Sequence, residues 1–295
     1  MRVLILGGTG MLGHKMHEVL AREHDVVSTT RRPLSQLPVD PSVFLRDGEV
    51  IEGVDASQIS ALRELVADVE PDAVVNCVGV IKQRDAAHDA IPSISINALL
   101  PHQLAELCAA RGARLFHFST DCVFSGAQGD YVEESSSDAI DLYGRTKFLG
   151  EVSQAPALTI RSSIIGRELD HFESLVEWFL RQRGEIAGFT HAIYTGVTTH
   201  QMALTVGRLL REQVQLTGLY QLASDKVSKY GLLMMMREAF GLEERIRIEP
   251  CDEPVCDRSL RGDKFLATTG IAVPPWPEML RELANDSERY EGARP

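Results

Sequence analysis

A tyrosine and a lysine four positions apart are the side chains in this sequence whose spacing best suits proton transfer. Tyr143 and Lys147 stand in the segment Tyr-Gly-Arg-Thr-Lys, and a helix would place them on one face, about one turn apart. A free phenol has a pKa of about 10, and a nearby ammonium favours the phenolate. We therefore expect Lys147 to lower the pKa of Tyr143 and to tune it for acid–base catalysis at neutral pH.

A hydroxyl that could hold the substrate lies upstream of this pair. Thr120 directly follows Leu115–Ser119, a run whose apolar residues predict a strand. Its hydroxyl could hold a carbonyl oxygen in register with Tyr143, so that hydride reaches the carbon while a proton reaches the oxygen. This is the chemistry of ketone reduction. Tyrosine and lysine at this spacing are common by chance, so the prediction depends on their position after the fourth expected strand.

A glycine-rich segment at the start of the chain could bind a dinucleotide. It reads Gly-Gly-Thr-Gly-Met-Leu-Gly, directly after the first expected strand and at the start of the first expected helix. Glycines permit a tight turn and a close approach to a pyrophosphate, and a helix N-terminus supplies unpaired N–H donors. The residues that we expect to bind the cofactor here are Gly7, Gly10, Met11, Leu12 and Gly13.

The end of the second expected strand indicates which dinucleotide binds. A site for NAD usually carries an acidic residue about 20 positions after the glycines, where it binds the ribose 2′-hydroxyl. This sequence has Arg31 and Arg32 instead, and guanidinium groups are suited to a 2′-phosphate. We therefore predict NADPH rather than NADH as the cofactor.

Further cofactor contacts are expected after the next strands. Asp55 precedes a helix that begins near Gln58, and it could either accept from the adenine amino group or cap that helix. Cys77, Val78 and Gly79 follow another expected strand, where small residues would let the backbone pass the adenosine ribose.

Short β-branched runs alternate with longer helical patterns in the first half of the chain, as in strand–helix–strand units. The expected strands are Val3–Leu6, Val26–Thr29, Ala73–Asn76, Leu115–Ser119 and Leu158–Arg161, and the expected crossover helices are Met11–Glu23, Gln58–Val69, Ile96–Arg111 and Leu142–Gln154. They predict an α/β fold with a Rossmann-type, doubly wound parallel sheet, whose ligand lies beyond the carboxyl ends of the strands. Residues 1–162 would form an NADP-binding domain. Residues 163–295 would form a smaller substrate-binding lobe, partly interleaved with the NADP-binding domain. This lobe has a Gly-rich stretch around Gly184–Gly196, and its expected helices are Phe172–Arg183, Gln201–Gln213 and Lys229–Phe240.

Composition supports an enzyme-sized globular chain. The 295 residues are 44% hydrophobic and 24% charged, which argues against disorder. A net charge of −12 repels nucleic-acid backbones and anionic lipid surfaces, so we expect neither as a partner. The first apolar run is too short for a signal sequence or a membrane span, which favours a cytoplasmic protein. Five cysteines without metal-binding spacing predict reduced thiols and no metal site.

Together these segments resemble the extended short-chain dehydrogenase/reductase superfamily. The similar segments are Gly7–Gly13, Ser119–Gly126, Tyr143–Lys147 and Gly150-Glu151. Within the superfamily, the likeness is to dTDP-4-dehydrorhamnose reductase and related sugar-nucleotide reductases. The resemblance implies that Thr120 binds the keto oxygen, that Tyr143 donates the proton, and that Lys147 tunes Tyr143 and holds the nicotinamide ribose.

The resemblance also concerns residues outside this trio. It implies a structural role for Asn97, for which a helix cap is the alternative. Arg161 and Arg258 could contact a substrate pyrophosphate, and for Arg258 the resemblance suggests this role. Cys122 stands where the family often has tyrosine, and Gly-Val-Thr-Thr at residues 196–199 replaces a more usual Gly-x-Pro-Thr. Both departures leave the identity of the sugar open.

The expected function is NADPH-dependent reduction of a nucleotide-activated 4-keto-6-deoxysugar, in deoxysugar biosynthesis. One alternative is a nucleotide-sugar epimerase or dehydratase that regenerates its cofactor in each cycle. The other is a non-catalytic subunit that binds NADP and regulates a partner enzyme. The helices expected at Ile96–Arg111 and Leu142–Gln154 could form a four-helix contact in a homodimer.

Overall fold

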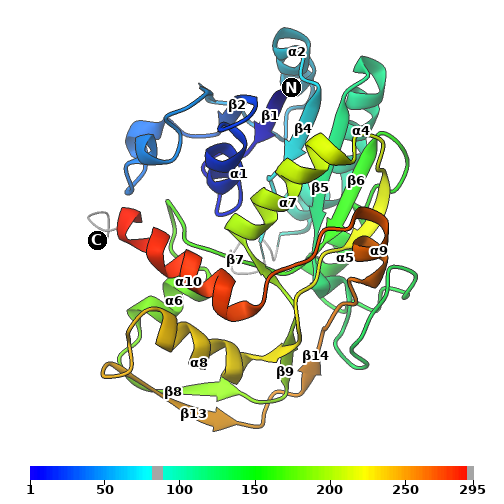
Figure 1. Cartoon of the computed structure of the whole chain (residues 1–295). Coiled ribbons are helices and arrows are strands. Elements are labelled where there is room, and N and C mark those ends of the chain that lie inside the picture. Colours follow the sequence, from blue (N-terminus) through cyan, green and yellow to red (C-terminus); the bar gives the residue numbers. More distant parts are fainter. Residues whose placement is uncertain (82–88, 291–295) are drawn as a thin grey trace.

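The central element of the protein is a seven-stranded parallel sheet, seen in a computed structural model that describes residues 1–81 and 89–290 (Figure 1). Its strand order is β11-β6-β5-β4-β1-β2-β3, and every neighbouring pair is parallel. The strands are β1 (Arg2–Leu6), β2 (Asp25–Thr30), β3 (Glu49–Glu52), β4 (Ala73–Asn76), β5 (Arg114–Ser119), β6 (Ala157–Arg161) and β11 (Gly218–Gln221). The predicted doubly wound α/β fold is confirmed.

The five expected strands are all present, but the sheet has seven strands, two more than predicted. β3 and β11 form its two edges. β3 is four residues long with glutamate at both ends, and β11 reads Gly-Leu-Tyr-Gln. Neither pattern has the β-branched run of a buried strand. Backbone pairing with β2 and β6, which the tertiary structure supplies, makes them strands.

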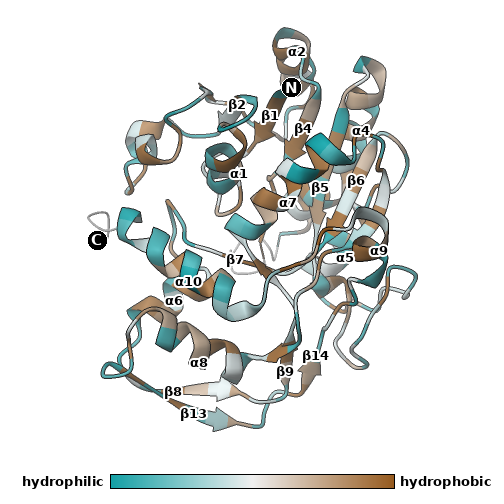
Figure 2. Cartoon of the chain, viewed as in Figure 1, coloured by the Kyte–Doolittle hydropathy of each residue, from teal (hydrophilic) through white to brown (hydrophobic). Residues whose placement is uncertain are grey.

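Successive residues of the strands face opposite layers of helices. Val3 and Ile5 of β1 lie in a core shared with α1 (Gly13–Leu20), α7 (Thr199–Glu212) and α10 (Trp276–Asp286). Leu4 and Leu6 lie in a second core with α2 (Ile59–Val69) and α4 (Leu100–Arg111). Both faces are therefore covered, as a parallel sheet requires. Figure 2 shows β1 and β4, at the centre of the sheet, in brown, as strongly apolar strands.

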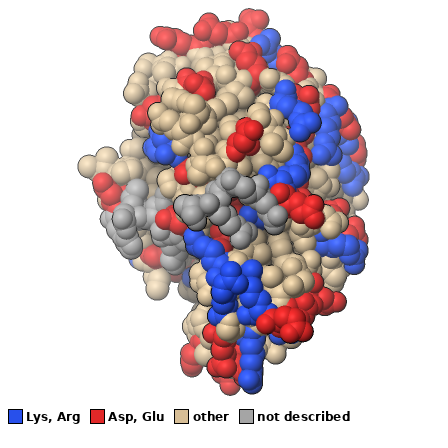
Figure 3. Space-filling view, turned by 90° about the vertical axis from the view of Figure 1, so that its left-hand side faces the viewer, with Lys and Arg blue, Asp and Glu red and all other residues tan. Residues whose placement is uncertain are grey.

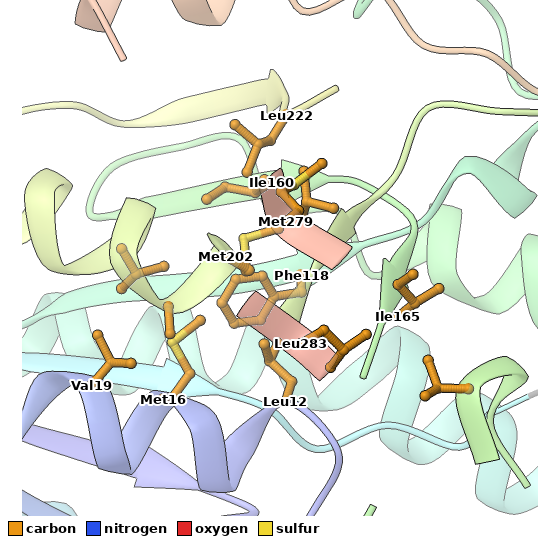
Figure 4. Packing of buried hydrophobic residues seen from close by; sticks show 14 of the residues in the cluster. Leu12, Met16, Val19, Phe118, Ile160, Ile165, Met202, Leu222, Met279 and Leu283 are labelled. Carbon is orange, nitrogen blue, oxygen red and sulfur yellow. The ribbon is translucent and has the colours of Figure 1, made fainter. Parts of the chain in front are cut away.

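The first core extends well beyond the sheet. Figure 4 shows Leu12, Met16 and Phe118 meeting residues from α7 and α10, among them Met202 and Met279. All these side chains are buried. Because α10 comes from the end of the chain, its packing joins the C-terminal part to the first helix.

The helix boundaries differ from expectation beside the future site. Where one helix was expected at Ile96–Arg111, residues up to Leu99 belong to a π-helical segment, η4 (Ile94–Leu99), which follows α3 (Ala90–Ser93), and α4 begins only at Leu100. α5 spans Leu142–Leu149 and ends well before Gln154. A Cβ at Gly150 would lie 1.9 Å from the carbonyl oxygen of Asn97, so a glycine is needed where α5 ends against η4.

The later part of the chain forms a small lobe below the sheet (Figure 1). We use this name for β8 (Gly184–Phe189), β9 (Ala192–Tyr194), β12 (Val227–Ser228), β13 (Ile246–Cys251), β14 (Cys256–Asp257), α6 (Leu175–Arg181) and α8 (Lys229–Ala239). The stretch around Gly184–Gly196 thus contains two strands. Short elements complete the fold: β7 (Ile164–Ile165), β10 (Val197–Thr198), α9 (Asp263–Thr269) and η6 (Ser287–Tyr290).

Surface charge is mixed in sign despite the net negative charge. Figure 3 shows acidic and basic side chains interspersed over one face, with a band of basic ones in its lower half. Within residues 1–81 and 89–290, no helix is long and apolar enough to cross a bilayer. The same residues contain no group of three His, Cys, Asp or Glu side chains placed to hold a metal ion.

Candidate active site

A cavity of about 560 Å³ lies where the small lobe meets the carboxyl ends of the strands. On the sheet side it is lined by Gly10, Met11 and Leu12, by residues 76–81, by residues 118–122, and by Tyr143 and Lys147. On the other side it is lined by Phe189, Ala192, Ile193, Tyr194, Lys229, Cys256 and Arg258, among others. The predicted catalytic trio and part of the predicted cofactor site therefore share one cavity.

Local capping brings Thr120 and Tyr143 together. Thr120 follows β5, and its Oγ1 accepts from the backbone N–H of Cys122 at 3.1 Å and donates to Oδ1 of Asp121 at 3.0 Å. Asp141 caps α5, because its Oδ1 accepts from the N–H of Gly144 at 2.7 Å. A Cβ at Gly144 would lie 2.2 Å from the carbonyl oxygen of Cys122. Glycine thus lets the first turn of α5 touch the turn after β5.

The phenol of Tyr143 is kept neutral by its surroundings. Burial raises its pKa, and Coulombic interactions with Cys122, Asp121 and Asp141 act in the same direction, while a hydrogen bond with Thr120 opposes the shift. The expected lowering of this pKa by Lys147 was therefore wrong. A neutral phenol can donate a proton, which is what reduction of a ketone requires.

Lys147 is buried at the cavity wall. Its Nζ donates to the carbonyl oxygen of Phe118 at 2.6 Å, and burial lowers its pKa to about 8, although the carboxylate of Glu151 opposes this. A pKa of about 8 leaves the amine mainly charged at neutral pH. The side chain can therefore still hold a polar ligand as a cation.

A buried ion pair beneath the trio went unnoticed in the sequence. Arg161 donates through Nε and Nη2 to the two carboxylate oxygens of Glu151, both at 2.7 Å. Ser119 Oγ donates to Glu151 Oε1 at 2.6 Å. Arg161 was suggested as a pyrophosphate contact, but it is 2% exposed and occupied by this pair. In the sequence, the only indication that Glu151 lies near the site was its position four residues after Lys147.

The turn after β1 has the shape that a pyrophosphate needs. Gly7 has a φ of +83°, and a Cβ at Gly13 would lie 2.0 Å from the carbonyl oxygen of Gly7. Gly10, Met11 and Leu12 line the cavity, whereas Gly7 and Gly13 shape the turn. The close backbone approach and the start of α1 fit a dinucleotide phosphate.

The C-terminal segment supports this turn, which the sequence did not predict. His14 Nδ1 contacts the carbonyl oxygen of Gly10 at 2.8 Å, and its Nε2 contacts the hydroxyl of Tyr290 at 2.6 Å. Burial lowers the pKa of His14 to about 3, so the ring is neutral. Because Gly10 can only accept there, Nδ1 carries the proton and Nε2 accepts from Tyr290.

The two predicted 2′-phosphate ligands differ in their contacts. Arg31 is exposed, and it forms no ion pair with the described residues. Arg32 pairs with Asp170, which lies between β7 and α6. From the sequence, both arginines were expected to bind the 2′-phosphate, because local patterns do not show an ion pair between residues more than a hundred positions apart.

Of the remaining predicted cofactor contacts, some line the cavity and one does not. Cys77, Val78 and Gly79 line the cavity. Asp55 does not line it, and its Oδ1 accepts from the N–H of Ser57 at 2.9 Å in the turn before α2. Asn97 binds the backbone of Val80 twice, through Oδ1 to its N–H and through Nδ2 to its carbonyl oxygen, both at 2.9 Å.

The small lobe adds Lys229 and Tyr194, which sequence patterns did not single out, and the wall also includes Arg258, which was suggested as a pyrophosphate contact. Lys229 Nζ lies 4.0 Å from the centre of the Tyr194 ring. Arg258 Nε donates to the carbonyl oxygen of Phe124 at 2.9 Å, and its Nη1 lies 3.7 Å from Cys122 Sγ. These groups form the wall opposite the sheet, so they are candidates for contacting the substrate.

Comparisons with known proteins identify similar sequences. A probable dTDP-4,6-dihydroxy-2-methyloxan-3-one 4-ketoreductase of Streptomyces antibioticus is 33% identical over 160 residues, covering 54% of this chain and 48% of that protein. Methionine adenosyltransferase 2 subunit beta of Pongo abelii is 24% identical over 269 residues, covering 86% of this chain and 76% of that one. The match to the first curated relative thus spans about half of its length.

Solved structures share the fold. A crystal structure of dTDP-4-dehydrorhamnose reductase from Bacillus anthracis in complex with NADP superposes with a TM-score of 0.78, at 20% identity, covering 97% of this chain and 99% of that one. The family model described as the RmlD substrate binding domain matches residues 1–289. Since that match takes in the phosphate turn, the trio and the small lobe together, the chain belongs to the RmlD substrate-binding domain family.

Proposed function

We propose that the protein is an NADPH-dependent reductase of a nucleotide-activated 4-keto-6-deoxysugar. The observation that carries this proposal is the meeting of Thr120, neutral Tyr143 and charged Lys147 in one cavity with the glycine turn. Residues 1–162 would bind the cofactor, and residues 163–295 would supply most substrate contacts. The family membership and the names of the curated relatives support this reading.

Each member of the trio has a distinct task. When bound, NADPH supplies the hydride that reduces the carbonyl carbon. Tyr143 donates its proton to the carbonyl oxygen, and Thr120, hydrogen-bonded to that phenol, orients the oxygen. Lys147 holds the ribose hydroxyls as a cation, and the carbonyl of Phe118 fixes the position of its amine. The low-polarity surroundings that keep the phenol neutral also strengthen these hydrogen bonds.

A second candidate is a non-catalytic subunit that binds NADP and regulates another enzyme. The match to methionine adenosyltransferase 2 subunit beta, which covers 86% of this chain, favours it. An epimerase or dehydratase is a third reading, since it would use the same tyrosine and lysine. Stoichiometric oxidation of NADPH by a nucleotide-linked 4-keto sugar separates the reductase from both alternatives.

We also propose a homodimer in which α4 and α5 of two chains meet. Large apolar side chains are exposed beside these helices, with Ile94 48%, Leu99 50% and Leu149 60% accessible. A contact between two copies would cover them.

Replacing Tyr143 with phenylalanine tests the proton donor. We expect turnover to fall by about 10²- to 10⁴-fold, the usual range for loss of a positioned acid, with little change in NADPH affinity. Steady-state kinetics and cofactor titration measure the two effects. Tyr230→Phe is a matched control, since that tyrosine lies in α8 and does not line the cavity. Full activity of the Tyr143 variant would refute the assignment.

The pH dependence of the reaction tests Lys147. Its pKa is lowered to about 8, so the cation predominates below that pH and is lost as the pH rises through it. We expect kcat/KM to fall above about pH 8, with no falling limb from Tyr143, whose pKa is raised. In Lys147→Met the rate should be lower and this limb absent. A wild-type profile that stays flat through this range would contradict the role.

The two arginines after β2 are tested by cofactor binding. In Arg31→Ala/Arg32→Ala, we expect NADPH to bind about 10- to 100-fold more weakly, because charge-assisted hydrogen bonds to the 2′-phosphate are lost. NADH binding should stay within about twofold. Isothermal titration of both cofactors gives the ratio. An unchanged ratio, or equal affinities in the wild type, would exclude this preference.

Sedimentation velocity tests the dimer. The wild type should sediment as a dimer, and Leu99→Glu/Leu149→Glu should be monomeric because charge would be buried at the contact. Leu204→Glu on α7, also exposed, is the control and should remain dimeric. A monomeric wild type would rule the contact out.

A further inference from the structure

The loop between β7 and α6 crosses to the half of the chain that carries the two arginines after β2. Leu169 is fully buried in a cluster with Phe44 and Tyr290, and Phe172 packs against the same cluster. Phe44 belongs to the segment between β2 and β3. The loop is therefore attached to the segment that follows the arginines.

The backbone of this loop is strained at two consecutive residues that are not glycine. His171 has a φ of +67° and Phe172 a φ of +55°, a region that side chains with a Cβ disfavour. Asp170 supports the turn, because its Oδ1 accepts from the N–H of His171 and its carbonyl oxygen accepts from the N–H of Phe172, both at 2.9 Å. The position of the Asp170 carboxylate is thus set by the loop and its packing.

The second oxygen of that carboxylate contacts one of the two arginines predicted to bind the 2′-phosphate. Oδ2 of Asp170 pairs with Nη2 of Arg32, and it lies 3.1 Å from Nε2 of His171. The Asp170 side chain is 19% exposed and the Arg32 side chain 42%. A partly shielded carboxylate holds a cation more strongly than a fully exposed one.

The neighbouring arginine has no such partner. Arg31 forms no ion pair among the residues that the structure describes, and Asp55 senses its charge only at a distance. Of the two guanidinium groups suited to a 2′-phosphate, that of Arg31 is therefore available, and that of Arg32 is paired with the carboxylate of Asp170, which is distant in the sequence.

We propose that Asp170 is a specificity-determining residue, whose carboxylate competes with the 2′-phosphate of NADPH for Arg32 and so limits the preference for NADPH over NADH. This inference rests on the proposed use of NADPH. A phosphate dianion and a carboxylate that share one guanidinium repel each other and divide its N–H donors. A cofactor with a 2′-hydroxyl does not meet this repulsion.

Asp170→Asn tests the competition. Asparagine keeps the Oδ1 acceptor for the His171 N–H but removes the negative charge. The probes are 2′,5′-ADP and 5′-AMP, which differ in the 2′-phosphate, and isothermal titration measures both without any catalysis. We expect the variant to bind 2′,5′-ADP about two- to tenfold more tightly, as for loss of a partly exposed charge interaction. Binding of 5′-AMP and the melting temperature should change little.

Two further variants sharpen the test. Glu212→Gln removes a carboxylate that is paired with Arg208 elsewhere on the surface, and it should leave the ratio of the two affinities unchanged. In an Arg32→Ala background, Asp170→Asn should no longer tighten 2′,5′-ADP binding, because the competed group is gone.

Several results would overturn the proposal. One is an unchanged ratio of the 2′,5′-ADP and 5′-AMP affinities in Asp170→Asn. A second is weaker binding of 2′,5′-ADP by this variant, which would mean that Asp170 orients Arg32 for the phosphate. A third is tighter binding of 2′,5′-ADP that persists in the Arg32→Ala background. If the wild type binds the two probes equally well, the proposed NADPH preference fails as well. If the wild type prefers 2′,5′-ADP and Asp170→Asn changes nothing, only the role of Asp170 fails.

Discussion

The site depends on one close contact, between the first turn of α5 and the turn that follows β5. Gly144 permits it, because any Cβ there would collide with the carbonyl oxygen of Cys122. The contact places the phenol of Tyr143 against the hydroxyl of Thr120. It also buries the phenol, and burial, rather than a neighbouring ammonium, sets its protonation. The packing that positions the phenol of Tyr143 is therefore the same packing that keeps its proton in place.

A buried ion pair next to this contact joins Arg161 at the end of β6 to Glu151, which follows α5, and Ser119 at the end of β5 contacts the same carboxylate. Glu151 receives two hydrogen bonds from Arg161 and one from Ser119. Such a pair offers little net stability over apolar packing, but losing one partner typically costs about 3–5 kcal/mol because a buried charge is left alone. Its carboxylate also raises the pKa of Lys147 against the effect of burial. The carboxylate of this ion pair therefore affects the pKa of Lys147, in addition to being part of the buried core.

Segments from the second half of the chain support the first half around the cavity. Tyr290 reaches the phosphate turn through His14, and Leu169 and Asp170 reach the segment after β2. Each connection is buried or partly buried. The proposed cofactor side of the cavity is therefore shaped by residues that follow Tyr143 in the sequence. The glycine turn and the two arginines by themselves give no sign of these residues.

Periodicity and turn chemistry predicted which segments form β1, β2, β4, β5 and β6, where the glycine turn lies, and that Thr120, Tyr143 and Lys147 follow the fourth expected strand. These features arise from local preferences and from the rule that parallel strands place their carboxyl ends together. Only the tertiary structure decided the edge strands β3 and β11, the neutral state of Tyr143, the burial of Arg161 and the pairing of Arg32. Those properties depend on desolvation and on contacts between residues far apart in the chain, and neither quantity is expressed in the spacing of neighbouring residues.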